Sequence, residues 1–115
     1  MSGGAENTAS ADGATVGGGQ QNRADGEEAV VCGGWGNGAR AQSATVGGGD
    51  NNEATGDLST VGGGQENDAE GEGATVAGGL RNDATADYAT VPGGVFNEAA
   101  GESSLAAGDS AKARS

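Results

Sequence analysis

The stretch "ATVGGGQQNRADG", residues Ala14–Gly26, decides the fold because the chain repeats its pattern with a fixed step of 15 residues. One column of the repeat is valine, at Val16, Val31, Val46, Val61, Val76 and Val91. Another column is asparagine, at Asn22, Asn37, Asn52, Asn67, Asn82 and Asn97. No insertion breaks the register from Gly3 to Gly94. Such a period predicts a repeat architecture in which each unit is one turn of a stack.

The pattern inside one unit indicates a coil of two short extended arms. Thr15 alternates with Ala14 and Val16, which predicts a strand with the alanine and valine facing inward. The glycines that follow allow a tight turn with positive φ, and asparagine tolerates the left-handed region. Arg23 and Asp25 then alternate with small residues in a second arm. The unit is too short and too rich in glycine for two helices.

We therefore predict an all-β fold, a parallel β-solenoid of 15-residue rungs stacked about 4.8 Å apart. The valines form its structural spine. The asparagines, in register, are expected to form a hydrogen-bonded ladder of side chains. Residues 1–105 hold seven repeats, and residues 106–115 are a partial eighth repeat or a C-terminal tail.

Composition alone would favour disorder, because only 33% of the 115 residues are hydrophobic and the net charge is −12. The strict period argues against that alternative. A coil of alanine and valine has a thin core, which buries little apolar surface. We therefore expect copies to associate side by side in a closed oligomer, which supplies the missing burial.

The 17 acidic and five basic residues limit the classes of partner. So acidic a surface repels nucleic acid and anionic membranes, and no apolar run is long enough to span a membrane. The composition is typical of proteins from saline surroundings, where salt screens the repulsion; an ordinary acidic surface is the alternative. One carboxylate column comprises Glu53, Asp68, Asp83 and Glu98. We interpret it as solvated acids, with relief by bound Ca²⁺ or Mg²⁺ as the alternative.

The sequence predicts no catalytic, cofactor-binding or metal-ligating residue. The glycine loops lack the Gly-Lys-Ser/Thr ending of a phosphate-binding loop. The chain has no histidine, a single cysteine (Cys32) and no nucleophile elbow. We therefore expect a protein that is not an enzyme.

The stretches "ATVGGGQQNRADG", "ATVGGGDNNEATG", "STVGGGQENDAEG" and "ATVAGGLRNDATA" resemble the YadA-like head repeats of trimeric autotransporter adhesins. The ending "SLAAGDSAKARS" resembles the other form of that repeat. The resemblance implies a left-handed parallel β-roll, a homotrimer, and valine and alanine columns packed around the trimer axis. It comes without a signal peptide, coiled-coil stalk or membrane anchor, so we expect an excised head or a free-standing protein that shares the fold.

These observations predict a trimeric spike or fibre segment with a structural or host-attachment role, on a virion surface or otherwise extracellular. Its partners would be other virion or surface-fibre proteins and a host surface receptor, bound through many weak contacts. Trp35, Tyr88 and Phe96 lie off the inward columns and are the candidate partner contacts; packing between subunits is the alternative for them. The alternative function is ice binding by a row of threonines, Thr15, Thr45, Thr60, Thr75 and Thr90.

Overall fold

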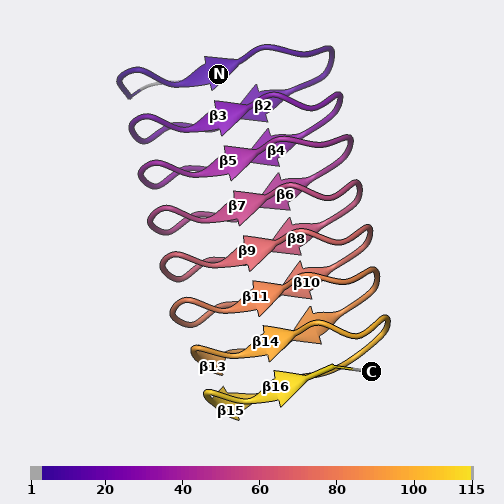
Figure 1. The fold of residues 1–115 in the computed structure, drawn as a ribbon. Helices are drawn as coiled ribbons and strands as arrows, with labels where there is room; N and C mark the ends of the chain where they lie inside the picture. Colours follow the sequence, from indigo (N-terminus) through magenta and orange to yellow (C-terminus); the bar gives the residue numbers. More distant parts are fainter. Residues whose placement is uncertain (1–3, 115) are drawn as a thin grey trace.

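The protein is a parallel β-solenoid, as predicted. The computed structural model describes residues 4–114, and these form about seven turns of a flat coil without any helix. Figure 1 shows the rungs stacked one below another, from the N-terminus in indigo to the C-terminus in yellow. The stack measures 39 by 22 by 13 Å along its principal axes. The described residues therefore contain no helical segment able to cross a membrane.

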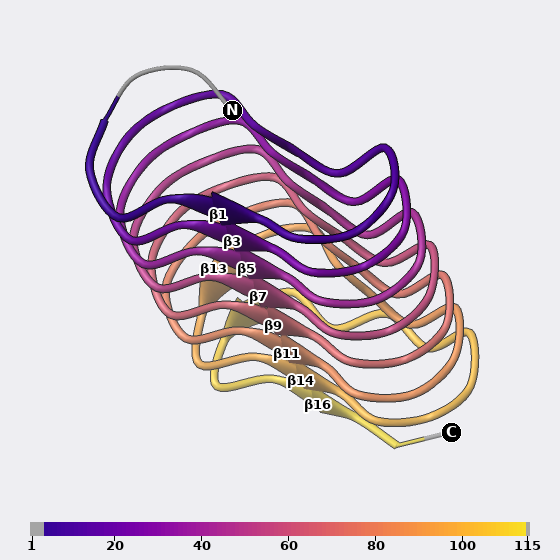
Figure 2. The same cartoon turned by 90° about the horizontal axis from the view of Figure 1, so that it is seen from above.

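Each rung contributes one short strand to each side of the coil. The eight-stranded sheet contains β1 (Thr8–Ala9), β3 (Arg23–Ala24), β5 (Gly38–Ala39), β7 (Glu53–Ala54), β9 (Asp68–Ala69), β11 (Asp83–Ala84), β14 (Glu98–Ala99) and β16 (Lys112–Ala113). The six-stranded sheet contains β2 (Thr15–Val16), β4 (Val30–Val31), β6 (Thr45–Val46), β8 (Thr60–Val61), β10 (Thr75–Val76) and β12 (Thr90–Val91). A small sheet pairs β13 (Gly94–Val95) with β15 (Gly108–Asp109). Figure 2, seen down the stack, shows the strands of the eight-stranded sheet along one side of a flattened loop.

Paired residues in consecutive strands of both sheets are 15 positions apart, which is the period of the sequence. Ala24 pairs with Ala39 in one sheet, and Val31 pairs with Val46 in the other. The last rung is shorter, because Glu98 pairs with Lys112 after a step of 14 residues.

The core consists almost entirely of alanine and valine enclosed by a single chain. All six valines of the spine have 0% of their surface exposed, and so do the alanines that face them, such as Ala24 and Ala39. The resemblance had implied that these columns pack around a trimer axis, and this expectation is wrong. The two arms of each rung lie close enough for side chains of this size to fill the space between them, so the core needs no partner to bury it.

The asparagines join consecutive rungs mainly through the main chain. Asn37 donates from its main-chain nitrogen to Oδ1 of Asn22 at 3.0 Å. Its Nδ2 donates to the carbonyl oxygens of Gly33 and Gly49, both at 2.9 Å. The sequence suggested a ladder between side chains, whereas these bonds satisfy the carbonyl groups of the glycine turn. The same arrangement recurs at the other buried asparagines, so this asparagine ladder consists of Asn22, Asn37, Asn52, Asn67, Asn82 and Asn97.

Two columns in which non-glycine residues adopt the left-handed conformation form the corners of the coil. At the non-glycine members φ lies between 52° and 61°. The corner after the glycine turn holds Glu6, Gln21, Gly36, Asn51, Glu66, Arg81, Phe96 and Ser110, and the opposite corner holds Gly13, Glu28, Ser43, Leu58, Gly73, Tyr88 and Ser103. Corner amides donate back to the preceding rung, as Leu58 N does to Gln42 O at 2.9 Å. Asparagine tolerates this conformation, but the asparagine column does not adopt it. The asparagines are held by their side chains within the coil.

Candidate functional site

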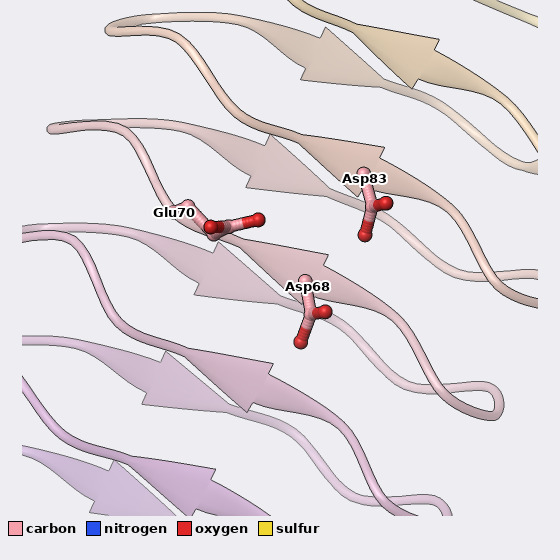
Figure 3. A group of neighbouring side chains, drawn as sticks. All are labelled: Asp68, Glu70 and Asp83. Carbon is pink, nitrogen blue, oxygen red and sulfur yellow. The ribbon is translucent and has the colours of Figure 1, made fainter.

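A column of four carboxylates follows the outer surface of the eight-stranded sheet. These residues, Glu53, Asp68, Asp83 and Glu98, occupy the first position of β7, β9, β11 and β14, and we call them the acidic ladder. The parallel register places each directly over the next. Neighbouring strands in a sheet are about 4.8 Å apart, so the like charges of adjacent carboxylates repel one another. Figure 3 shows Asp68 and Asp83 pointing out from the sheet on consecutive rungs.

The two ends of the acidic ladder are neutralised by cations, and its centre is not. Arg40 Nε donates to Glu53 Oε1 at 2.8 Å. Lys112 Nζ lies 3.8 Å from Glu98 Oε1. Between residues 4 and 114, no basic side chain forms an ion pair with Asp68 or Asp83. The central pair is therefore the place where the ladder is least compensated.

The pKa of both central carboxyl groups is raised, first by burial and then by repulsion from neighbouring carboxylates. Burial, followed by repulsion from Asp83, Glu53 and Glu70, raises the pKa of Asp68 to about 6. The pKa of Asp83 is also raised, first by burial and then by Glu70 and Glu98. A hydrogen bond between the two carboxyl groups favours the proton on Asp68 and the charge on Asp83. The pair can therefore share one proton in mildly acidic solution.

A third carboxylate, that of Glu70, makes the centre of the acidic ladder a candidate cation site. Glu70 follows Ala69 of β9 and so projects on the same side of the sheet as Asp68 (Figure 3). One oxygen from each of Asp68, Glu70 and Asp83 lies within 4.8 Å of the others. Calcium takes six to eight oxygen ligands, so these residues would supply part of a shell that water completes. The sequence analysis identified the column but missed Glu70, although the alternation within β9 predicts that Asp68 and Glu70 share a face.

A shallow hollow of about 370 Å³ lies beside the acidic ladder. Its lining residues are Gly36, Asn51, Glu53, Glu66 and Asp68. The side chains around it are carboxylates and an amide, all of which accept hydrogen bonds. The chemistry of this surface suits small cations and ammonium or guanidinium groups.

The three aromatic candidates for partner contact are exposed but do not meet. The exposed fraction is 44% for Trp35, 54% for Tyr88 and 47% for Phe96. Trp35 and Phe96 belong to the glycine side of the coil, four rungs apart, whereas Tyr88 is in the opposite corner. Three separate contacts are therefore available, rather than one aromatic patch.

Two of these aromatics are held in place by neighbouring rungs. Tyr88 Oη donates to Glu72 Oε1 at 2.9 Å, and its ring lies against Gly73, where a Cβ would come within 2.8 Å of it. The guanidinium of Arg81 lies 5.7 Å from the ring centre of Phe96 and is itself 3.3 Å from Glu66. Rigid exposed rings lose little conformational entropy when a partner binds.

Comparison with protein-family models and with curated proteins finds no match for this chain. The resemblance to YadA-like head repeats therefore remains a prediction based on the residues quoted above.

Proposed function

We propose that the chain is a structural display protein: a trimeric spike or fibre segment on a virion or cell surface that attaches its carrier to a host. Its mechanism is multivalent presentation. Weak contacts made by three copies of each corner add up through their high effective concentration.

The observation that carries this proposal is that each rung keeps its structural residues inside and its variable residues outside. The valines, alanines and asparagines that hold the coil together are enclosed. The outer residues change from rung to rung without disturbing them. Tyr88 and Phe96 are exposed on corners that the register holds in place, and Trp35 is exposed beside one of them. A rigid scaffold with variable exposed corners is well suited to displaying contact residues.

The trimer, the left-handed coil and a saline setting are part of the same proposal. Threefold assembly and handedness rest on the resemblance to adhesin head repeats. The saline setting rests on the net charge of −12, because salt screens repulsion between exposed carboxylates.

Two measurements test the proposal. Light scattering in molar sodium chloride should give three times the chain mass of 10.8 kDa; a stable monomer would overturn the trimer. Immunogold labelling of the native source, with an antibody raised against this chain, should decorate the surface of virions or cells. Label confined to the cell interior would overturn the display function.

A second candidate function, ice binding, is favoured by the threonines of the six-stranded sheet. Thr45, Thr60, Thr75 and Thr90 form one in-register, half-buried column on its outer surface. A thermal-hysteresis assay distinguishes the two functions. Clear hysteresis that is lost in Thr60→Val and retained in the matched variant Thr55→Val, on the other side of the coil, would replace attachment with ice binding.

A further inference from the structure

The two sides of the coil differ sharply in charge. The six-stranded sheet and the glycine turn after it are built from six equivalent segments: 14–20, 29–35, 44–50, 59–65, 74–80 and 89–95. Of the 17 acidic and five basic residues of the chain, only Asp50 lies in these segments. We call the surface that they form the neutral face. Figure 2 shows the strands of the eight-stranded sheet, which carry the charged side, along one side of the loop.

Three glycines in one column of the neutral face are not required by the chain itself. A Cβ added at Gly33, Gly63 or Gly78 would meet no atom within 4 Å, and φ at these three residues lies outside the left-handed region, whereas Gly48 and Gly93 of the same column have φ of 154° and 157°. The next column is different: at Gly34 φ is 92°, and a Cβ would overlap the carbonyl oxygen of Gly49. Glycine at Gly33, Gly63 and Gly78 is therefore explained neither by conformation nor by space within one copy. A residue without a side chain at these positions would let another backbone approach closely.

The neutral face also carries apolar groups that one copy leaves in contact with water. Trp35 is 44% exposed, and Val30, Leu80 and Val95 are half-buried. A neighbouring molecule that covers this surface can bury these apolar groups.

Electrostatic repulsion between carboxylates favours the neutral face as the surface on which two copies of this chain meet. Like charges about 4 Å apart repel by about 1 kcal/mol in water and by more where protein displaces the water. Two copies, each with a net charge of −12, cannot approach through their carboxylate columns without that cost. The neutral face is the surface on which they can meet. The stack is 39 Å long and 22 Å wide, so its broad side offers on the order of 800 Å², the area that each partner buries in a standard stable interface.

We propose that the neutral face is the self-association surface, on which further copies of this chain pack with their glycine columns in close contact. The inference rests on the proposed oligomer and specifies its interface. The acidic ladder then points outward from the assembly.

A matched pair of variants tests the assignment. Gly63→Glu adds a negative charge to the neutral face at a position with space for a side chain. Thr55→Glu adds the same charge on the opposite side, where Thr55 is exposed. In light scattering at molar salt, Gly63→Glu should reduce the particle mass to that of one chain, whereas Thr55→Glu should retain the wild-type mass. An unchanged mass in both variants, or equal loss in both, overturns the assignment.

Cys32 provides a second readout that requires no change to the fold. Its thiol is exposed in the single chain and belongs to the neutral face. A bulky maleimide should label the wild-type oligomer at least tenfold more slowly than the Gly63→Glu monomer. If wild type is monomeric, both the oligomer and its interface are overturned. If wild type is trimeric but Cys32 reacts equally fast in both proteins, only the interface is overturned.

Discussion

The interior and the exterior of this coil obey different rules. The enclosed columns of valine, alanine and asparagine hardly change over seven rungs. The corners outside them accept glutamate, arginine, leucine and phenylalanine at equivalent positions. The difference shows that the structural demands of the fold are confined to the enclosed columns and the tight glycine turn. The outer columns are free to carry charge on one side and to lack it on the other.

The largest effect is expected from breaking the asparagine ladder. Asn52→Ala removes two bonds from Nδ2, to the carbonyl oxygens of Gly48 and Gly64, and leaves the amide of Asn67 without its acceptor. Each polar group that is left buried and unpaired costs about 1–3 kcal/mol. The free energy of unfolding, measured in urea, should fall by about 4 kcal/mol. Thr55→Ala, on the exposed surface of the opposite side of the coil, is the control and should change it by less than about 0.5 kcal/mol.

Two adjacent glycines, Gly33 and Gly34, test the difference between positions that the fold constrains and positions that it leaves free. Gly34→Ala forces a Cβ against Gly49 at φ 92°, and strain of this kind costs about 1–3 kcal/mol before the overlap is counted. Gly33→Ala meets open space. The midpoint of urea unfolding should fall strongly for Gly34→Ala and hardly change for Gly33→Ala in the dissociated chain. Similar losses at both positions would contradict the distinction between the two columns.

The sequence predicted the interior far better than the exterior. The valine and asparagine columns could be read from the period because enclosed positions in stacked rungs face identical surroundings, and identical surroundings select identical residues. The left-handed corners could not, because Glu28, Leu58 and Tyr88 have side chains that disfavour this conformation. Their amides are held instead by bonds to the preceding rung, which only the stacking supplies.

The candidate cation site was predictable only in part. The column from Glu53 to Glu98 is visible in the period. The contribution of Glu70 depends on the alternation within one strand, and the neutralisation of the two ends depends on the conformations of long side chains. Arg40 reaches Glu53 from the preceding rung, and no spacing rule specifies that contact.

A moderate effect of pH on the free energy of unfolding is expected, and it arises at Asp68 on the outer surface of the eight-stranded sheet. Since the folded-state pKa of Asp68 is raised from 3.8 to about 6, the folded chain binds a proton more tightly than the unfolded chain. Stability should therefore increase as pH falls from 7 towards 4, by about 1 kcal/mol once solvent screening is included. Asp68→Asn should flatten this part of the profile and stabilise the protein at pH 8. Glu27→Gln, an exposed control, should leave the profile unchanged; a profile that rises with pH in wild type would contradict the prediction.

The smallest effect is expected at Ser59, an exception within the otherwise uniform interior. Ser59 occupies the column of Ala44 and Ala74, and its hydroxyl is fully enclosed without a hydrogen-bond partner among the described residues. Ser59→Ala removes this unpaired group and should raise the free energy of unfolding by less than about 1 kcal/mol. Ser104 is the matched control in the same column, because its Oγ accepts a hydrogen bond from the amide of Gly101 at 3.2 Å. Ser104→Ala should therefore lower stability; if both variants shift it in the same direction, hydrogen bonding does not distinguish the two serines.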